Sequence, residues 1–524
     1  MVFGEAGWFN FYVMYEETEF KLSLSPSVAD RILSHKVLKP LRKGRPTKSH
    51  LISTYFDTPR HALRKSEIAL RVRSNGNGRK QTIKAPFQGP AGLQNFREWT
   101  VDVNDNFPDL RAVDDPAIVR KLYRRRYEKR LGPVFTTDFK REAIRLRTAG
   151  AEFELAVDRG EILAETLGVS VSEPICEVEF ELLSGDPARM FDIALELCEA
   201  YDLRLTHLTK AQRGYALVRP SLRPKPVKAP KILLSEEMSV AEAFNSIIGG
   251  SLEHMFANEI PTLEGKAEGV HQTRVAMRRL RAALRAFKKV LPYDKRKAFN
   301  GEFRWFQQRL APARDWQVFL GETLQKIAAS APGDEQAVER LRRVARVERR
   351  RAVGDAVAYL ESRRYARLLL QFERWIASVG RDKGSRVLRG SVNPFAKSVL
   401  GRTWRYFLED RRPLSRLADE DLHEIRKRGK KARYATQFFS SLWDGPAVEP
   451  FMKLMGRFQD SMGKTNDAIV ARHMLAAVKP GRIDPLLIRL AQDWSQARIR
   501  KCLRAAQPQW RRLGRIEPFW ETGD

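Results

Sequence analysis

Charged residues occupy every second position in several short segments of the first 220 residues. These segments carry carboxylates at Glu17, Glu19, Glu177 and Glu179, and cations at Lys21, Arg71, Arg73 and Lys84. Because successive side chains of a strand point to opposite faces, each segment predicts a strand with one charged and one apolar face. Carboxylates bind hard divalent cations, whereas Lys and Arg bind phosphate oxygens. Both residue types together would bind a phosphate chain and metal ions in one cavity.

A closed sheet would bring these charged faces together. Any one of the strands is explained by a sheet with one solvated face, which is common in antiparallel β structure. Several such strands in one chain favour a sheet that closes around a charged interior, and such an interior needs a compensating ligand. A triphosphate with Mg²⁺ or Mn²⁺ would supply it.

The sequence predicts an α+β protein of several domains. Alternating segments in the first half indicate an antiparallel β tunnel or barrel, and long segments of helical periodicity in the second half indicate an all-α helical bundle. A stretch with four prolines, PSLRPKPVKAPK, predicts an exposed, semi-rigid linker between them. The expected divisions are an N-terminal extension, tunnel domain, linker, helical domain and tail, at residues 1–13, 14–219, 220–234, 235–510 and 511–524.

The motifs of the first half occur in an order that resembles the CYTH superfamily of triphosphate tunnel enzymes. They are E-x-E-x-K at Glu17, YFDTP from Tyr55, LRVR from Leu70, TIK ending at Lys84, DFKRE from Asp138, ELAVDRGEI from Glu154, PICEVEFELLSGD from Pro174 and LTKAQRGYAL from Leu208. The set is most similar to the bacterial inorganic triphosphatases of that superfamily. The resemblance implies a metal-dependent triphosphatase.

The resemblance also implies roles for single residues. The metal ligands would be Glu17, Glu19, Glu177 and Glu179. The phosphate chain would be bound by Lys21, Arg71, Arg73, Lys84, Arg141, Lys210 and Arg213. Catalysis would depend on Glu17, Glu19, Lys21 and Lys84. Glu154, Asp158 and Glu181 fall at matching strand positions as contacting or supporting residues, and Phe96-Arg97-Glu98 departs from the R-x-E that the family often shows.

The implied reaction is attack of water, in line, on a terminal phosphorus while cations neutralise the charge of the transferred group. Such a reaction needs no covalent intermediate. The residues do not identify the group that takes the proton.

A pattern of basic residues occurs twice in the second half, with an offset of 152 residues. It comprises His271, Arg274, Arg278, Arg279 and Arg281 in one copy, and His423, Arg426, Lys430, Lys431 and Arg433 in the other. Phe287 and Asp315 match Phe439 and Asp467 at the same offset. The repeat predicts two related helical subdomains with approximate two-fold symmetry.

The repeated helix resembles the CHAD domain, through HQTRVAMRRLRAALRAF, LAPARDWQVF and HEIRKRGKKARY. A solvated helix face explains either basic stripe alone, but few acidic residues lie nearby to offset the repulsion between its cations. The resemblance implies that inorganic polyphosphate binds to a basic groove lined by His271, Arg274, Arg278, Arg281, Arg285, His423, Arg426, Lys427, Lys430, Lys431 and Arg433.

Composition limits the class of protein. The net charge is +31, and its excess lies in the second half: residues 1–220 hold 35 Lys and Arg against 30 Asp and Glu, whereas residues 221–524 hold 60 against 34. This field attracts polyanions without identifying them. Three cysteines without CxxC spacing argue against disulfides or zinc, and no apolar run suggests a membrane span or secretory signal. We expect a cytoplasmic protein, with polyphosphate granules as one place of action.

The leading hypothesis is an enzyme that hydrolyses inorganic triphosphate to pyrophosphate and phosphate and whose helical domain binds polyphosphate. Two alternatives remain: a CYTH enzyme for an organic triphosphate, such as a thiamine triphosphatase or adenylyl cyclase, and a polyphosphate-granule binding protein with little or no hydrolysis. Nucleic-acid binding ranks last, because no known motif or aromatic stacking platform accompanies the basic helices. The oligomeric state is left open.

Overall fold

The computed structural model describes residues 12–74, 78–87, 89, 93–113, 115–116, 118, 130–329, 335–380, 386–476 and 485–521. Residues 1–11 of the predicted N-terminal extension and 522–524 of the predicted tail lie outside this set. The chain forms two compact units, Met1–Pro224 with Glu361–Ser378, and Lys225–Leu360 with Val379–Asp524.

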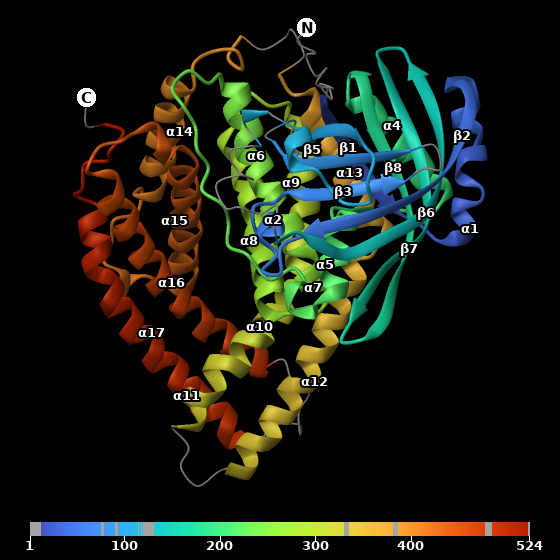
Figure 1. The fold of residues 1–524 in the computed structure, drawn as a ribbon. Helices are drawn as coiled ribbons and strands as arrows, with labels where there is room; N and C mark the ends of the chain where they lie inside the picture. The colour runs from blue at the N-terminus through green and yellow to red at the C-terminus, as the bar shows by residue number, and fades with distance from the viewer. Residues whose placement is uncertain are drawn as a thin grey trace, which may run out of the picture. The chain divides into compact units, whose positions relative to one another are not determined.

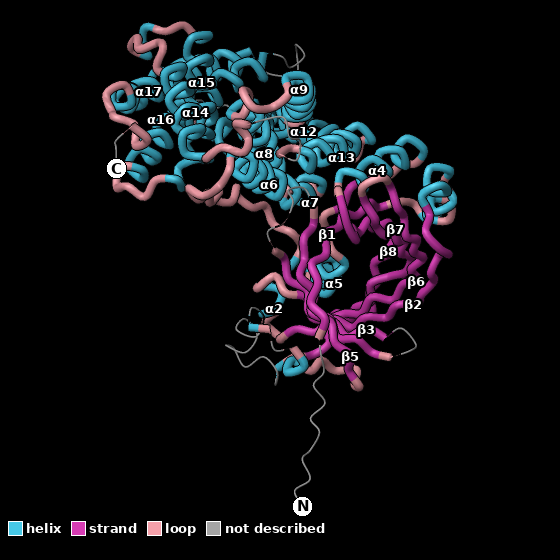
Figure 2. Tube along the Cα trace, turned by 90° about the horizontal axis from the view of Figure 1, so that it is seen from above, coloured by secondary structure: helices cyan, strands magenta, loops and turns pink. Residues whose placement is uncertain are grey.

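The first unit is built on an antiparallel sheet that closes on itself (Figures 1 and 2). Its described strands are β1 (Val13–Ser23), β2 (Arg42–Asp57), β3 (Ala69–Ser74), β4 (Arg79–Pro86), β5 (Gln94–Val103), β6 (Gly132–Thr148), β7 (Ala151–Thr166), β8 (Val169–Gly185) and β9 (Arg204–Thr206). The order is β5-β4-β3-β2-β6-β7-β8-β1-β9, and a further pairing of β5 with β1 closes the ring. The predicted β tunnel is confirmed.

The alternation on β1 sorts charged from apolar side chains. Phe20 lies outside the barrel, where its ring stacks on Phe180 of β8 at 4.6 Å and on Phe191 at 4.7 Å. Phe191 belongs to α4 (Ala188–Ala200), a helix that covers this outer face. The neighbouring Glu19 and Lys21 consequently point inward.

Strands β3, β4 and β5 follow the same rule. Leu70, Val72, Ile83 and Trp99 are buried in one apolar cluster on their outer face, and α2 (Ala62–Lys65) contributes Leu63 to it. Arg71, Arg73 and Lys84, which alternate with these residues, therefore share the inner face. Short helices complete this part of the unit, and they are α1 (Pro26–Ala29), η1 (Ile32–Ser34), η2 (Lys36–Leu41), η3 (Leu110–Ala112) and η5 (Pro220–Leu222).

Helix α5 (Lys210–Val218) packs against β6, β7 and β8, inside the ring of strands in Figure 2. A reciprocal capping box between Thr209 and Gln212 fixes its first turn. Tyr215 packs edge-on against Phe135 and donates a hydrogen bond to the buried Asp57 at 2.8 Å. This packing sets the N-terminus of α5, with Lys210, toward the charged part of the interior.

Helix α13 (Arg363–Ser378) lies within the sequence predicted as the helical domain but packs in the first unit. It contacts α4 and β9, and Arg367 and Arg374 form ion pairs with Glu199 and Asp192 of α4. Local periodicity predicts such a helix without indicating which unit it joins.

The second unit is helical, as predicted. Its described helices are α6 (Val240–Ala257), α7 (Glu259–Leu263), α8 (Ala267–Ala286), α9 (Tyr293–Arg309), α10 (Ala311–Val318), η6 (Phe319–Thr323), α11 (Leu324–Ala328), α12 (Glu335–Leu360), α14 (Val392–Phe407), η7 (Leu414–Arg416), α15 (Asp419–Phe439), η8 (Ser440–Leu442), α16 (Val448–Ala476) and α17 (Pro485–Leu513). None of the helices in the described part of the chain is long and apolar enough to cross a membrane.

The 152-residue repeat appears in the helix boundaries and in contacts between the copies. Helices α14 and α15 begin 152 residues after α6 and α8, at residues 392 and 419 against 240 and 267. Ser239 pairs with its repeat mate Ser391 in an antiparallel bridge. The rings of Phe287 and Phe439, also mates, lie 6.0 Å apart. The contacts between mates support the predicted two-fold arrangement.

The later part of the predicted linker, from Lys225, belongs to the second unit and is hydrogen-bonded within it. Val227 and Asn258 exchange two hydrogen bonds of 3.0 Å, and Leu234 donates to Ser441 at 2.9 Å. Ile232 and Leu234 are buried. Both residues follow Pro230, the last proline of the segment, and no residue of the stretch 220–231 itself is buried, in keeping with the predicted exposed linker.

Candidate functional site

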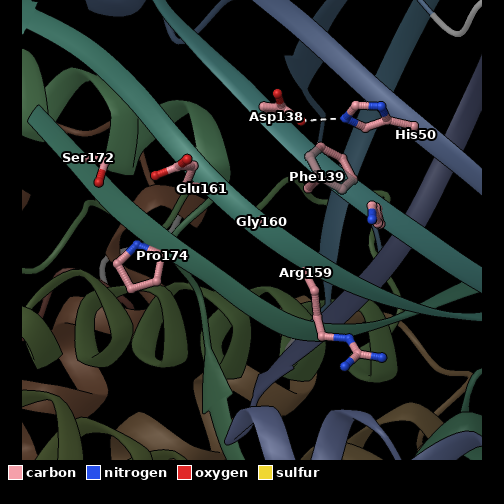
Figure 3. A pocket seen from close by; sticks show the side chains of 9 residues that line it. His50, Asp138, Phe139, Arg159, Gly160, Glu161, Ser172 and Pro174 are labelled. Atoms are coloured by element: carbon pink, nitrogen blue, oxygen red, sulfur yellow. Dashed lines mark hydrogen bonds and ion pairs between the residues drawn. The ribbon is translucent and has the colours of Figure 1, made fainter. Parts of the chain in front are cut away.

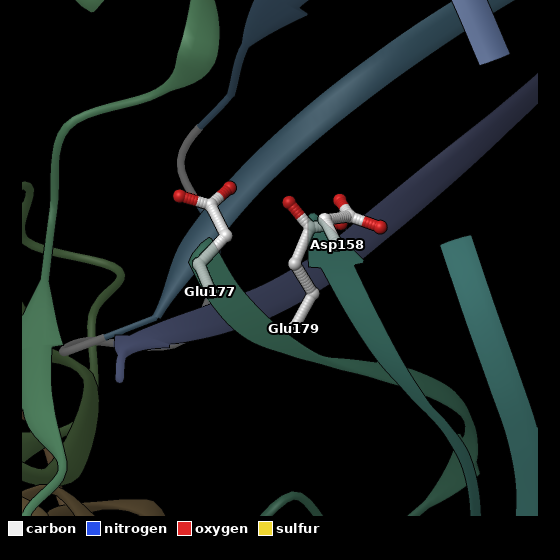
Figure 4. A group of neighbouring side chains, drawn as sticks. All are labelled: Asp158, Glu177 and Glu179. Carbon is white, nitrogen blue, oxygen red and sulfur yellow. The ribbon is translucent and has the colours of Figure 1, made fainter. Parts of the chain in front are cut away.

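Three carboxylates from neighbouring strands meet inside the barrel. Asp158 of β7 lies directly opposite Glu177 of β8, and Glu179 follows two residues later on the same face. One oxygen from each of the three lies within 4.8 Å of the others (Figure 4). All three side chains are buried, and Asp158 is 0% exposed.

Cations from two other elements, β6 and α5, compensate this cluster. Lys210 Nζ lies 2.7 Å from Asp158, 2.5 Å from Glu177 and 2.8 Å from Glu179. Arg141 of β6 donates two hydrogen bonds of 2.7 Å to Asp158 and also contacts Glu179. Arg213, one turn along α5 from Lys210, pairs with Glu173 at 2.7 Å and Glu177 at 3.3 Å.

A second group of charges surrounds Lys84 on β4. Its ammonium group contacts Glu17 and lies 3.5 Å from Glu19 and 3.0 Å from Glu98. Lys21 joins the two groups, because Nζ lies 3.1 Å from Glu19 and 2.7 Å from Glu179. The inner faces predicted for these strands thus meet in one continuous network.

Arg71 and Arg73 face the interior with less compensation. Arg71 lies 3.9 Å from Glu98, and Arg73 donates a hydrogen bond to Ser53 at 3.0 Å. Arg73 has no carboxylate within 4.0 Å among the described residues. Burial, together with the cations of Arg71 and Arg141, lowers the pKa of Arg73 to about 10. Arg73 thus remains a cation suited to an anionic ligand.

The charges around each carboxylate determine its proton affinity. Burial raises the pKa of Glu17 to about 8 although Lys84 opposes this, and burial with Glu19 and Glu154 raises the pKa of Glu181 to about 7. Glu179 is equally buried, but Lys21, Lys210 and Arg141 hold its pKa well below the usual value. The carboxylates therefore differ in the ease with which they lose a proton.

The donor set fits a hard divalent cation, because carboxylate oxygens are the ligands that such ions prefer. Asp158, Glu177 and Glu179 are close enough to share one ion. The four predicted ligands are divided: Glu177 and Glu179 belong to this cluster, whereas Glu17 and Glu19 lie beside Lys84. Asp158, which sequence reasoning gave a secondary place, is central here.

Two cavities of about 410 and 580 Å³ are lined mainly by residues outside this network, although Arg141 also lines the larger one. Both are lined by His50, Lys140 and Arg159, on the outer faces of β2, β6 and β7. Figure 3 shows the smaller cavity, with His50 and Arg159 labelled. His50 pairs with Asp138 at 2.6 Å, and Arg159 pairs with Asp30. Most charges of this face are compensated by neighbours, as expected of a solvated sheet surface.

The predicted basic stripes of the second unit lie on two helices that pack together, α8 and α15. No carboxylate lies within 4.0 Å of Arg274, Arg278, Arg426 or Lys430 in the described part of the chain. Burial and the neighbouring Arg426 and Arg278 lower the pKa of Lys430 to about 6. Burial, followed by nearby arginines, lowers the pKa of His271 to about 4. Like charges thus meet here, and the nearby Asp315 and Asp467 offset them only in part.

The other predicted groups of these stripes have partners of their own. Arg281 donates hydrogen bonds to Asn300 and Gln307 of α9, at 3.1 and 2.7 Å. Lys427 pairs with Glu424 at 3.3 Å, and Arg433 lies 4.0 Å from Asp460. Arg285 and Lys431 lie near Tyr406, with Lys431 Nζ 5.0 Å from the ring centre, and His423 is exposed on α15.

Sequence reasoning missed three polar residues of the tunnel. Tyr15 donates a 2.6 Å hydrogen bond to Glu98, which it faces across the β1–β5 pair. Ser53 and Thr137 are 0% and 1% exposed and face the interior beside Arg73. The alternation of β2 and β6 could have placed both hydroxyls inside.

Comparison with known proteins identifies two families in the chain. A CYTH domain matches residues 16–215, and a CHAD domain matches residues 246–476. The inorganic triphosphatase of Haemophilus influenzae is 28% identical over 207 residues, which are 39% of this chain and 56% of that protein. The matched region thus spans little more than half of that relative.

Two further similar proteins match over a larger share of this chain and of their own length. An uncharacterized protein of Mycobacterium tuberculosis is 25% identical over 435 residues, which are 79% of this chain and 80% of that protein. The crystal structure of the CHAD domain from the plant Ricinus communis, 26% identical, covers 56% of this chain and 98% of that one with a TM-score of 0.48. With both family models matched in order, the chain belongs to the proteins in which a CYTH domain is followed by a CHAD domain.

Proposed function

We propose that the β barrel is a metal-dependent inorganic triphosphatase. The observation that carries this proposal is the buried network in which Lys21 and Lys210 both contact Oε1 of Glu179. Such a concentration of both charges would bind a phosphate chain together with a divalent cation. The similarity to the Haemophilus triphosphatase supports the same reaction.

The barrel residues divide into those that would hold the metal ion and those that would bind the phosphate chain. Asp158, Glu177 and Glu179 would hold Mg²⁺ or Mn²⁺, with Glu17 and Glu19 as further carboxylates beside the substrate. A bound divalent cation supplies charge neutralisation and a lowered pKa for a nearby water molecule. The cations that would bind and orient the phosphate chain are Lys21, Arg71, Arg73, Lys84, Arg141, Lys210 and Arg213. Burial would strengthen each of these charge interactions by excluding water.

We further propose that the helical unit binds inorganic polyphosphate. The supporting observation is the set of Arg274, Arg278, Arg426 and Lys430, four half-buried basic side chains without a carboxylate partner within 4.0 Å in the described part of the chain. Repulsion within the set would be relieved by a long polyanion, and its charges would release counterions from that chain. The repeat would present equivalent donors from both copies.

Phosphate release tests the enzymatic proposal. Purified protein would be given inorganic triphosphate, ATP, thiamine triphosphate or long-chain polyphosphate, with Mg²⁺ or with chelator. We expect release mainly from inorganic triphosphate, only with metal, and lost in the Glu17→Ala, Glu19→Ala variant. Glu161→Ala, on the outer face of β7, is the matched control. Preference for ATP or thiamine triphosphate would instead favour a CYTH enzyme that acts on an organic triphosphate.

Polyphosphate binding is measured separately, by titration of the full chain with long-chain polyphosphate. Arg278→Ala with Arg426→Ala should weaken binding and lower its salt dependence. Arg428→Ala, which removes a cation paired with Glu409 at 2.7 Å, is the control on α15. If the protein binds polyphosphate but hydrolyses no substrate, the granule-binding alternative remains. If the Arg278→Ala, Arg426→Ala variant binds polyphosphate as tightly as Arg428→Ala, these basic residues of α8 and α15 are not the binding surface.

A further inference from the structure

Three strands place a guanidinium and two hydroxyls side by side on the inner face of the barrel. Ser53 of β2 lies directly opposite Arg73 of β3 on one side and Thr137 of β6 on the other. Directly opposed side chains of an antiparallel pair have Cβ atoms about 5 Å apart. The three polar groups therefore form one short row.

The row has hydrogen-bonding capacity that the protein does not use. Ser53 is 0% exposed and accepts a hydrogen bond from Arg73 Nε at 3.0 Å, so its hydroxyl hydrogen remains available for an acceptor. Thr137 is 1% exposed, and its Oγ1 has no hydrogen-bond partner among the described residues. A buried hydroxyl without a partner is unfavourable, so its presence calls for a ligand.

The chemistry of the missing partner follows from the donors. Arg73 has a fork of guanidinium hydrogens and no carboxylate within 4.0 Å in the described part of the chain. Two hydroxyls beside it can each donate to an anionic oxygen. A tetrahedral phosphoryl group offers several such oxygens at once, whereas a metal ion would be repelled by the guanidinium.

We propose that Ser53 and Thr137 form, with Arg73, a subsite for one phosphoryl group of the substrate. The subsite rests on the proposed triphosphatase function and adds two neutral donors to its charged residues. Neutral donors bind phosphate oxygens without adding to the repulsion that Arg71 and Arg141 already exert on Arg73. Ser53 and Thr137 thus act as substrate-binding residues.

The test compares Thr137→Val and Ser53→Ala with Thr136→Val in the full chain. Thr136 is the neighbour of Thr137 on β6, but its hydroxyl lies on the outer face, 3.4 Å from that of Thr54. For each inner-face variant we expect KM for inorganic triphosphate, and Kd for triphosphate titrated with chelator present, to rise about tenfold, as for a lost hydrogen bond to a charged group. Thr136→Val should change neither constant.

Stability without ligand separates this role from a structural one. Thr137→Val removes an unpartnered hydroxyl and keeps the shape of the side chain, so its unfolding temperature should equal or exceed that of the wild type. Inner-face variants that match Thr136→Val in KM and Kd would overturn the subsite while leaving the triphosphatase intact. A wild type that neither binds nor hydrolyses triphosphate would overturn the proposed function and the subsite together.

Discussion

Lys21 of β1 and Glu179 of β8 stand directly opposite each other, and their charged atoms are 2.7 Å apart inside the barrel. The same ammonium group lies 3.1 Å from Glu19. Lys21 therefore connects the carboxylates around Lys84 with those around Lys210. The stability of the barrel should accordingly depend on this charge network.

Replacing Lys21 by Met should destabilise the protein. Removal of one partner from a buried ion pair costs roughly 3–5 kcal/mol, because the remaining charges lose their compensation. Mg²⁺ should restore part of this loss, because it would supply positive charge near Glu179. The free energy of unfolding, measured in denaturant with Mg²⁺ or chelator, checks both effects. Lys48→Met, an exposed lysine on the outer face of β2, is the control.

Asp158→Asn should weaken metal binding. The substitution keeps the size of the side chain and removes one of the three charges that meet within 4.8 Å. Loss of a ligand or of its support lowers metal affinity by about 10–100-fold in other sites. Titration with Mn²⁺ in the absence of substrate gives the affinity directly. An affinity equal to that of Glu161→Gln, on the outer face of the same strand, would exclude Asp158 as a ligand.

Tyr15→Phe should weaken substrate binding more than turnover. Tyr15 holds Glu98 through a 2.6 Å hydrogen bond, and Glu98 in turn lies 3.0 Å from Lys84 and 3.9 Å from Arg71. Since Tyr15 is 41% exposed, the effect should stay near 1 kcal/mol, or about fivefold in KM. Steady-state kinetics with inorganic triphosphate separates KM from kcat. A change in kcat alone would contradict this positioning role.

Local patterns predicted which side chains face the interior but not which strands become neighbours. Alternation assigned Glu19, Lys21 and Lys84 to inner faces because it depends only on the pleat of each strand. The central place of Asp158 depends on the register of β7 against β6 and β8, which sets it opposite Arg141 and Glu177. A single sequence contains no direct signal for such pairing.

The helical half shows the same division. The repeat predicted matching helices because a duplicated unit keeps its spacing, and α8 and α15 begin 152 residues apart. It gave no information about α13, which packs against α4 within the first unit. The lowered pKa of Lys430 also depends on its burial and on the charges of Arg426 and of Arg278 from α8. Only the packing of the helices reveals these neighbours.

Polyphosphate binding should become weaker as the pH rises above about 6. Burial and the charges of Arg426 and Arg278 lower the pKa of Lys430 to about 6, so at pH 7 most of this amine is neutral. A bound polyanion would favour the charged form of Lys430 and raise its pKa. At a pH between the pKa of the free protein and that of the complex, binding should therefore be accompanied by uptake of a proton. The affinity is consequently highest where Lys430 is already protonated.

Calorimetric titration of the full chain at pH 7, in two buffers with different enthalpies of ionisation, measures this proton uptake. Lys430→Met should lose most of it and flatten the pH dependence of the affinity. Lys427→Met, whose amine is exposed and paired with Glu424, should retain both. Burial lowers the pKa of His271 to about 4, and the charges of Arg314 and Arg278 act in the same direction. This histidine should therefore take up less of the proton than Lys430 at pH 7. Equal proton uptake by the Lys430→Met and wild-type proteins would assign the titration to another group.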